Sequence, residues 1–443
     1  MATDDPTGEV TEVLQALIRN ACVNDGTAES GHEDRSAAVL ASYLEDVVDL
    51  QSYEPTPGRR SLVARIEGSD PTAPSLCLMG HTDVVPVTPE GWSRDPFGGE
   101  LVGGEVWGRG AVDMLNMTAS MAVAFRDLAA SGFRPRGTLI YLAVADEEAR
   151  AAHGAEWLVD HAWDAVGADY VVTESGGWHL HSAAGHHVAI TSGEKGTQAR
   201  RLRVRGTPGH GSMPLTADNA LLKAAEVVRR VAAIRPRSYL SEQWTAYVAG
   251  LDVTPEVRSA LLDPDRVWDA ARALPTGAGV AHAMTHTTFA PTVIHGGVKT
   301  NVIPDAVDVE VDIRIVPSET GDDVDRYLVS ALGELAGDVS IERVWDLPAS
   351  SSPTDTPLWD LLTRITQRAH PGAVVMPRLT PGGTDLTFYR AAGAVGYGFA
   401  VMSAQVDHRE FASRFHGNDE RIDVESLRLT TEAWGILARE FCG

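Results

Sequence analysis

The first half of the chain alternates between helical patterns and short apolar runs. Apolar residues recur at helical spacing between residues 8 and 49, with a polar interruption at 24–35, which predicts two opening helices. Short apolar runs bounded by turn residues then predict strands at 62–66, 75–79, 138–145 and 170–172. Helical patterns at 118–130 and 152–161 separate some of these runs. Strands that alternate with helices indicate an α/β sheet with crossover connections.

The pattern changes after Gly193. A strand-like run at 198–204 precedes a helical pattern at 219–232, and a helix-rich stretch continues to about residue 290 before two strand-like runs, at 292–294 and 307–315. This segment predicts an α+β domain inserted into the α/β domain. The α/β pattern resumes from residue 320, with helical patterns at 324–336, 357–369 and 424–441 and a loop at 380–385.

Charge and composition exclude several classes of protein. The 443 residues include 37 lysines and arginines against 61 aspartates and glutamates, so the formal net charge is −24. Neither nucleic acid nor an anionic membrane is therefore an expected partner. Three scattered cysteines predict no disulfide framework and no cysteine zinc site. Because the N-terminus is acidic and no apolar run reaches the ~20 residues of a membrane span, we expect a cytoplasmic protein.

Candidate chemistry lies at the ends of the predicted strands. The run 75–79 leads to His81, and α/β sheets bind ligands at the carboxyl ends of such strands. Asp83, two residues on, can hold the other ring nitrogen of that histidine. The run 138–145 leads to Asp146-Glu147-Glu148, where adjacent carboxylates repel one another unless cations compensate them. The strand that begins at Tyr170 leads in the same way to Glu174.

Two further candidates lie in loops. Asp113 precedes the helical pattern at 118–130, and His416 precedes the final helix. Each candidate alone also has a structural explanation: His81 as a core histidine, Asp113 as a helix N-cap, the acidic run as a solvated turn. Together they form a nitrogen and oxygen donor set that suits zinc, with cobalt or manganese as alternatives. Its members are His81, Asp113, Glu148, Glu174 and His416.

The balance of charge favours two metal ions over one. Two divalent cations balance three ligand carboxylates and a bridging hydroxide, whereas a single cation leaves the carboxylates in excess. Glu147 lies beside a ligand and is not needed as one, so it is the candidate general base.

The combined motifs resemble those of a known family. They are Gly80-His81-Thr82-Asp83, Gly108-Arg109-Gly110-Ala111-Val112-Asp113-Met114, Asp146-Glu147-Glu148, Gly382-Gly383-Thr384-Asp385 and His416. Their order over nearly the whole chain resembles the M20 metallopeptidase family, which includes aminoacylase-1, carboxypeptidase S, acetylornithine deacetylase and succinyl-diaminopimelate desuccinylase. The resemblance implies a zinc-exopeptidase-like catalytic domain, residues 1–195 and 318–443. It also implies an inserted α+β, ferredoxin-like lid and dimerisation domain, residues 196–317.

The resemblance also assigns roles to residues of the site. It implies that His81 and Glu174 hold one zinc ion, that Glu148 and His416 hold the other, and that Asp113 bridges them. It places Glu147 as the general base on a metal-bridging water and Asp83 as the residue that orients His81. It further implies a cis peptide bond between Asp113 and Met114.

In the inserted domain the resemblance implies residues that act on substrate. His210 matches a lid histidine that reaches the partner subunit's site and stabilises an oxyanion. Asn301 and Arg314 match substrate-binding positions, although Arg314 has the alternative of pairing with Asp312 or Glu310. Gly382, Gly383 and Thr384 match a loop that receives a terminal carboxylate, with a surface turn as the alternative.

The predicted activity is hydrolysis of an amide bond next to a free carboxylate. The expected substrate is an N-acyl amino acid or a short peptide, as for an N-acyl-amino-acid amidohydrolase or a carboxypeptidase S-like enzyme, and the expected assembly is a homodimer formed by the lid. A dipeptidase, a deacetylase or a desuccinylase of the same family is an alternative, as is a non-catalytic binding member. Glu194 argues against a desuccinylase, because that enzyme carries an arginine near this position. We expect the remaining histidines, including His179, His181, His186 and His187, to face solvent or to pack in the lid.

Overall fold

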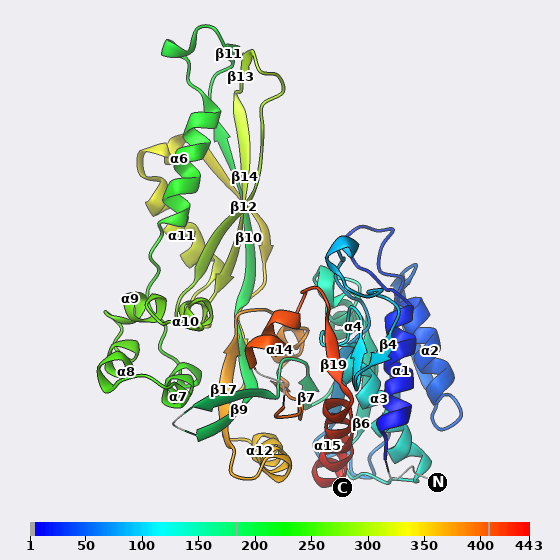
Figure 1. The fold of residues 1–443 in the computed structure, drawn as a ribbon. Helices are drawn as coiled ribbons and strands as arrows, with labels where there is room; N and C mark the ends of the chain where they lie inside the picture. The colour runs from blue at the N-terminus through cyan, green and yellow to red at the C-terminus, as the bar shows by residue number, and fades with distance from the viewer. Residues whose placement is uncertain (1–4, 183–184, 406–407) are drawn as a thin grey trace. The chain divides into compact units, whose positions relative to one another are not determined.

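The structure, a computed structural model, describes residues 5–182, 185–405 and 408–443. The chain divides into two compact units. Unit 1 comprises Met1–Ser192, Ser352–Arg378 and Thr384–Gly443, and unit 2 comprises Gly193–Ser351 and Leu379–Gly383 (Figure 1). The segment 196–317, expected as an insertion, therefore lies inside unit 2, and unit 2 continues to Ser351.

Unit 1 combines a mixed sheet with helices. Its helices are α1 (Thr7–Arg19), α2 (Asp34–Leu44), α3 (Leu115–Ala130), α4 (Ala155–His161), α5 (Trp163–Val166), α12 (Pro357–Ala369), α13 (Leu386–Ala391), α14 (His408–Arg414) and α15 (Val424–Cys442). Short 3-10 helices are η1 (Pro89–Gly91) and η2 (Glu147–Ala149). Its strands are β1 (Leu50–Thr56), β2 (Arg59–Ile66), β3 (Leu76–His81), β4 (Glu100–Val102), β5 (Glu105–Trp107), β6 (Leu139–Val144), β7 (Tyr170–Thr173), β8 (Trp178–Ser182), β18 (Val395–Gly398) and β19 (Arg421–Asp423). Strands β9 (Gly185–Glu194) and β17 (Val374–Thr380) begin in unit 1 and end in unit 2.

The strand order of the main sheet places three candidate segments next to one another. The order runs β1-β2-β6-β3-β7-β18-β9. Strand β3 pairs in parallel with β6 on one side and with β7 on the other, and β18 pairs in parallel with β7. Because parallel strands end at the same edge of a sheet, the residues after β3, β6 and β7 meet there.

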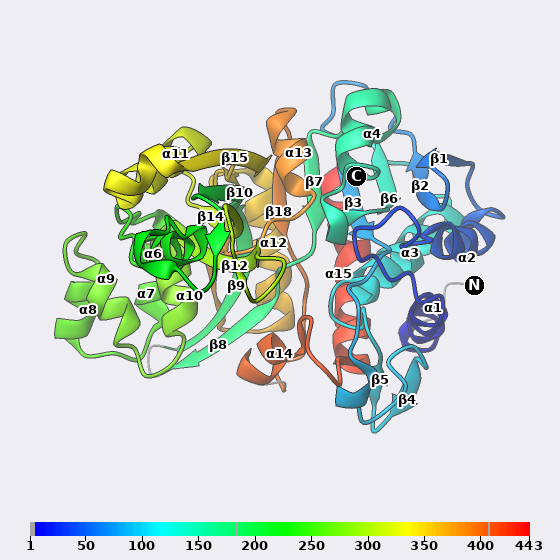
Figure 2. The ribbon, with the colours of Figure 1, turned by 90° about the horizontal axis from the view of Figure 1, so that it is seen from above.

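Alternation along the strands supplies the two cores of unit 1. Leu76 and Leu78 of β3 face a core built with α1, α2, α3, α12 and α15, whereas Cys77 and Met79 face a second core built with α4, α5 and α13. Figure 2 shows α3 and α15 on one side of β3 and β6 and α4 on the other. A parallel sheet covered on both faces explains why these strands appear in the sequence as continuous apolar runs.

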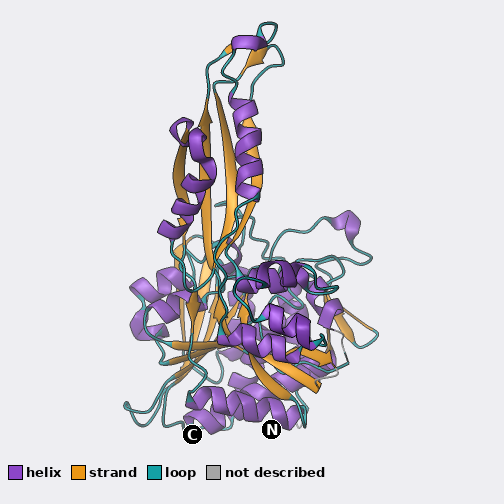
Figure 3. Cartoon of the chain, turned by 90° about the vertical axis from the view of Figure 1, so that its left-hand side faces the viewer, coloured by secondary structure: helices purple, strands orange, loops and turns teal. Residues whose placement is uncertain are grey.

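Unit 2 contains an antiparallel sheet of order β12-β14-β10-β15. Strand β14 alternates buried and partly exposed residues along its length, so that Val307, Val309, Val311 and Ile313 face a core shared with α6 and α11. Figure 3 shows the long strands of this sheet in orange beside purple helices. The strands of unit 2 are β10 (Gly196–Arg205), β11 (Gly209–His210), β12 (Thr288–Gly296), β13 (Val302–Ile303), β14 (Ala306–Ile315), β15 (Val339–Asp346) and β16 (Ser350–Ser351), of which β11 and β13 pair with each other and β16 pairs with β9. Its helices are η3 (Pro214–Thr216), α6 (Ala220–Ala232), α7 (Glu242–Gly250), α8 (Pro255–Leu261), α9 (Val267–Arg272), α10 (Ala278–Thr285), α11 (Gly321–Leu332) and η4 (Gly333–Asp338).

The predicted α/β fold with an α+β segment is confirmed. Helix α12 occupies the predicted range, whereas β1, the β8–β9 pair and β15 were not predicted from the sequence. Strands β1 and β15 are largely solvent-accessible, so they lack the apolar run that marks the buried strands. Among the residues that the structure describes, no helix combines the length and the apolar character needed to cross a membrane.

Candidate metal centre

Three predicted residues lie at the carboxyl edge of the parallel strands of unit 1. His81 is the last residue of β3, Glu148 lies in η2 after β6, and Glu174 directly follows β7. The chain turns sharply after two of these strands, because Asp146 and Ser175 both adopt a left-handed conformation with φ of 70°. Non-glycine residues rarely adopt this conformation, and it clusters at functional sites.

Asp113 and His416 complete the group from two loops. Asp113 precedes α3, and its peptide bond to Met114 is cis, as predicted. Asp113 Oδ1 lies 3.3 Å from His81 Nε2, and Asp113 Oδ2 lies 3.1 Å from His416 Nε2. Glu148 Oε2 is 3.5 Å from the same His416 nitrogen, and Glu174 Oε1 is 4.0 Å from His81 Nε2. Asp113 therefore lies between the two imidazoles.

These contacts define two sets of donor atoms that share Asp113, and a third set joins His81 to Glu147 and Glu148. His81, Asp113 and Glu174 offer ligand atoms that lie within 4.8 Å of one another, and so do Asp113, Glu148 and His416. The shared member is Asp113. The structure thus brings all five predicted ligands into one cluster.

Asp83 holds several residues of this cluster in place. It is fully buried, and its carboxylate accepts hydrogen bonds from the backbone N–H groups of Glu147 and Glu148 at 3.3 and 3.1 Å. His81 Nδ1 lies 3.0 Å from the Asp83 carbonyl and 3.5 Å from its carboxylate. Asn24 also donates to Asp83, at 2.9 Å. Asp83 therefore holds both the His81 ring and the turn that carries the two glutamates.

Glu420 is a supporting residue that the sequence analysis did not assign. Its buried carboxylate accepts hydrogen bonds from the backbone N–H groups of Val112 and Asp113, at 2.7 and 3.1 Å, and pairs with Arg109 at 2.6 Å. Glu420 thereby fixes the backbone that presents Asp113. Arg109 belongs to the Gly108–Met114 motif, but Glu420 lies 311 residues further along the chain, so no local signal in the sequence pairs them.

The electrostatics of the cluster fit divalent cations. Burial raises the pKa values of Glu147, Glu148 and Glu174, and neighbouring carboxylates raise them further. Hydrogen bonds to Asp113 and Glu148 raise the pKa of His416 to about 10. Glu148 Oε1 is buried, and no described residue donates a hydrogen bond to it. Excess buried negative charge with an unpartnered carboxylate oxygen is what a bound cation would resolve.

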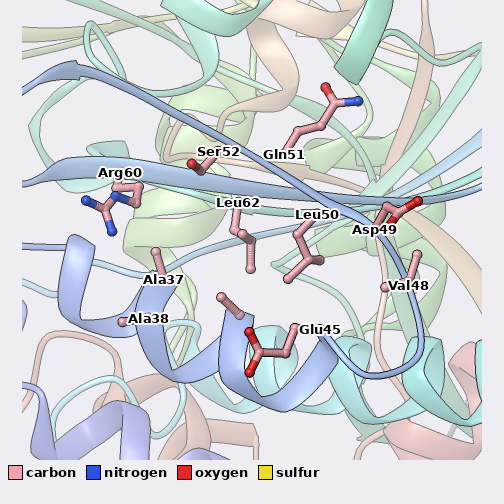
Figure 4. A pocket seen from close by; sticks show the side chains of 11 residues that line it. Ala37, Ala38, Glu45, Val48, Asp49, Leu50, Gln51, Ser52, Arg60 and Leu62 are labelled. Carbon is pink, nitrogen blue, oxygen red and sulfur yellow. The ribbon is translucent and has the colours of Figure 1, made fainter.

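A cavity elsewhere in unit 1 contains none of these residues. Its volume is about 400 Å³, and it lies between α2 and the β1–β2 hairpin, where Glu45, Leu50, Arg60 and Leu62 line it (Figure 4). This cavity is therefore separate from the five candidate ligands.

The candidate residues of unit 2 have their own surroundings. His210 is exposed in β11, and its Nδ1 lies 2.7 Å from Ser212 Oγ. Asn301 is exposed, and its carbonyl accepts from the Gly211 N–H at 2.9 Å. Arg314 pairs with Asp312 at 3.0 Å and donates to Thr197 Oγ1 at 2.8 Å, as the ion-pair alternative for this arginine anticipated.

The glycine loop follows β17. Gly382 and Gly383 are exposed and close unit 2, whereas Thr384 is buried and begins the last segment of unit 1. Thr384 Oγ1 accepts from the Leu386 N–H at 3.2 Å, at the start of α13. The roles of these three residues toward substrate stay a prediction.

Known proteins resemble this chain over most of its length. It is 26% identical to the N-fatty-acyl-amino acid synthase/hydrolase PM20D1 of Xenopus tropicalis over 96% of the chain and 84% of that protein. It is 27% identical to aminoacylase-1 of Sus scrofa, over 84% of the chain and 81% of the relative. It is also 27% identical to a succinyl-diaminopimelate desuccinylase of Parvibaculum lavamentivorans, over 88% of the chain and 85% of the relative.

Solved structures and a family model agree with these relatives. A metallo-carboxypeptidase of family M20 from Sulfolobus solfataricus has the same fold, with a TM-score of 0.73 at 16% identity over 99% of both chains. A dinuclear metal-binding peptidase of that family from Bacillus subtilis superposes with a TM-score of 0.61, at 13% identity over 98% of this chain and 99% of that one. Residues 77–440 match the model of the peptidase family M20/M25/M40, a span that contains every candidate ligand. The chain therefore belongs to this family and is a hydrolase of the M20 type.

Proposed function

We propose that the protein is a dinuclear zinc hydrolase that cleaves an amide bond next to a free carboxylate. The observation that carries this proposal is Asp113, which contacts both imidazoles and is shared by two sets of donor atoms. The names of the relatives support the reaction, because N-fatty-acyl-amino acid hydrolase and aminoacylase both describe cleavage of an acyl group from an amino acid.

The five clustered side chains would hold the metals. His81 and Glu174 would bind one ion, Glu148 and His416 the other, and Asp113 both. Imidazole and carboxylate donors suit zinc, and they also accept cobalt or manganese. When bound, the ions supply Lewis acidity that polarises the amide carbonyl and lowers the pKa of water toward ~7.

Glu147 moves the proton in this proposal. Its Oε2 lies 4.0 Å from His81 Nε2, beside the ligands, and its backbone is held by Asp83. Burial and the nearby Glu174 raise its pKa, which favours a carboxylate that gains a proton readily. Glu147 takes the proton of the attacking water and returns it to the leaving nitrogen. Asp83 acts as a positioning residue for both His81 and this turn.

Unit 2 supplies substrate recognition and the dimer. Large apolar side chains are exposed there, including Met213 at 68%, Leu215 at 97% and Val298 at 91%. Exposed apolar groups of this size mark protein contacts, and the occupant proposed is a second copy of the chain. Within that dimer, His210 of one subunit stabilises the oxyanion of the intermediate in the site of the other subunit. Asn301, Arg314 and the loop of Gly382, Gly383 and Thr384 bind the substrate's carboxylate and polar groups.

A substrate panel tests the proposal. The zinc-loaded protein is incubated with N-acetyl, N-succinyl and long-chain N-acyl amino acids and with dipeptides, cleavage is followed by mass spectrometry, and bound metal is counted in the same sample. We expect two ions in the cluster per chain and cleavage of an N-acyl amino acid. Preference for dipeptides or N-succinyl substrates would move the protein to one of the alternative subclasses. A metal-occupied cluster without cleavage of any member would overturn the proposed reaction.

A further inference from the structure

A group of histidines lies outside the site described above, on the β8–β9 hairpin of unit 1. His179 and His181 are two residues apart in β8, so they point to the same face of the strand. His186 of β9 lies directly opposite His181 in the antiparallel register, which brings it to that face as well. The expectation that these histidines face solvent or pack in the lid is wrong for His179 and His187, because both side chains are buried in unit 1.

The three imidazoles converge. His179 Nδ1 lies 2.8 Å from His186 Nε2, and ligand atoms of His179, His181 and His186 lie within 4.8 Å of one another. The rings of His181 and His186 stack with centroids 4.3 Å apart, and His370 packs edge-on against His179 at 4.6 Å. Nitrogens bound to one zinc ion at ~2.0–2.1 Å are about 3 Å apart. The His179–His186 pair is already near this spacing, and the His181 nitrogen lies within 4.8 Å of both.

A backbone carbonyl orients the buried ring. His179 Nε2 lies 3.0 Å from the carbonyl oxygen of Met402, which can only accept, so Nε2 carries the proton. The lone pair of His179 is then on Nδ1, which faces the other two imidazoles. Histidines that bind metals characteristically donate their second ring nitrogen to a carbonyl or carboxylate in this way.

Burial disfavours the protonated form of His179, His186 and His370. Burial lowers the pKa of His179 to about 4 and also lowers the pKa values of His186 and His370. Protonation of one ring would place a charge beside the others, which disfavours it further. Neutral imidazole is the form that binds a transition metal.

We propose that His179, His181 and His186 form a second metal site, separate from the Asp113 cluster, that binds one divalent transition-metal ion. Three imidazole nitrogens select zinc, copper, nickel or cobalt over magnesium and calcium. Because the donors come from both strands, the ion links β8 to β9 and leaves a further coordination position open beside the exposed His181. The role of such an ion is to hold the hairpin.

Metal counting on the full chain tests this site. The protein is freed of metal, reloaded with Zn²⁺ and desalted, and bound zinc is measured by mass spectrometry. The double variant His181→Gln/His186→Gln is expected to bind one zinc ion fewer per chain than the wild type. The matched control is His295→Gln, which removes an exposed histidine of β12 and is expected to keep the wild-type count.

Copper gives a second readout that does not depend on catalysis. Cu²⁺ bound at this site is expected to give an electron paramagnetic resonance spectrum with coupling to several imidazole nitrogens, and the double variant is expected to lose that component. Equal zinc counts and equal copper spectra in folded wild type and variant would show that the imidazoles only pack together. If circular dichroism shows that the double variant is unfolded, the same zinc and copper measurements are made on the single variant His181→Gln, which should fold because this side chain is exposed. Retention of the ion with unchanged affinity in that variant overturns the proposal.

Discussion

Glu147 and Glu148 are adjacent in the chain, yet their carboxylates have different partners. Glu148 Oε2 faces His416 at 3.5 Å, whereas Glu147 Oε2 is 4.0 Å from His81 and lies outside both donor sets that contain Asp113. The same buried carboxylate of Asp83 accepts from both backbone N–H groups, so the turn itself is fixed. At the scale of single residues, one step along this fixed turn therefore separates the proposed ligand Glu148 from the proposed base Glu147.

The role of Glu147 predicts a specific defect. In Glu147→Gln the amide keeps the shape of the side chain but cannot take a proton, so kcat should fall about 10²–10⁴-fold while the metal count stays unchanged. Steady-state kinetics with metal analysis measure both quantities. Glu12→Gln, at an exposed position of α1, serves as the control. Full activity of Glu147→Gln at unchanged metal content contradicts its assignment as the base.

Glu420 predicts a loss of stability instead. Glu420→Ala leaves Arg109 buried without its partner at 2.6 Å and removes the acceptor of two backbone N–H groups, so the free energy of unfolding should fall by about 3–5 kcal/mol. Glu420→Gln keeps an acceptor and should lose less. The exposed pair of Arg428 and Glu432 provides the comparison, because Glu432→Ala should cost less than about 1 kcal/mol. Urea unfolding followed by circular dichroism measures the differences, and equal losses at the two sites would falsify the argument.

At the scale of elements, sheet topology assembles the candidate centre. Strands β6, β3 and β7 are parallel neighbours, so three turns distant in sequence meet at one edge. In unit 2, the antiparallel pairing of β10 with β14 builds one core instead. Lys195 lies at the start of unit 2, where it connects β9 to β10, and it is buried. Its ammonium group donates to the carbonyl of His286 at 2.7 Å.

Lys195 predicts a pH dependence of stability. Burial lowers its pKa from 10.5 to about 7. Between these two pH values the unfolded chain binds the extra proton, so the stability of the folded state rises with pH across this range. The buried lysine is most costly below about pH 7. Lys195→Met should therefore raise the free energy of unfolding there, by about 1–3 kcal/mol after the loss of the hydrogen bond to His286 is counted. That gain should shrink as the pH approaches 10.5.

Denaturant unfolding at several pH values checks this prediction. Lys223→Met is the control, because the Lys223 ammonium group pairs with Asp218 and Asp338 at the surface and its loss should bring no gain. A gain for Lys195→Met that does not vary with pH would point to packing rather than to the buried charge.

At the scale of the whole molecule, the chain belongs to the M20 family and divides into two compact units. The chain is an M20-type hydrolase, and its candidate centre lies entirely in unit 1. His210 and Arg314 lie in unit 2. The proposed function requires residues of both units and of two subunits, and this requirement makes predictions that single-site variants do not test.

Removal of metal should affect activity and stability together. A ligand that binds only the folded state stabilises it by mass action, so a strong chelator should lower Tm as it abolishes turnover. Added zinc should restore both. Differential scanning fluorimetry and activity in the same samples provide the measurement. The inactive Glu147→Gln variant should show the same drop in Tm on chelation. Absence of that drop would show that the stability of the fold does not depend on metal held by the proposed ligands.

Mixing two inactive variants tests the dimer. If His210 acts in the site of the other subunit, a dimer of one Glu147→Gln chain and one His210→Ala chain contains one complete site. That site has Glu147 from the His210→Ala chain and His210 from the Glu147→Gln chain. Random exchange makes half of the dimers mixed, so activity should recover to about a quarter of the wild-type value. Each variant alone, taken through the same exchange, is the control. No recovery, with mixed dimers detected by native mass spectrometry, argues that each chain uses its own His210.

The five candidate ligands were predictable because each follows a local signal. His81 and Glu174 end apolar strands, Glu148 lies in an acidic turn, and Asp113 and His416 precede helices. Such signals depend on a few neighbouring residues, and these motifs also indicated the family. Glu420 and Asn24 had no such signal, because their partners Asp113 and Asp83 are distant in sequence.

The amino-acid sequence by itself predicted the fold class and the donor types of the candidate ligands, since strand and helix periodicity and donor type are properties of local segments, and the order of its motifs indicated the family. Only the tertiary structure decided which strands are neighbours, how Asp113 lies between two imidazoles, and that His179, His181 and His186 converge on one hairpin face. The physical reason is that register, burial and contact depend on pairings between distant segments, and these pairings form only when the whole chain packs.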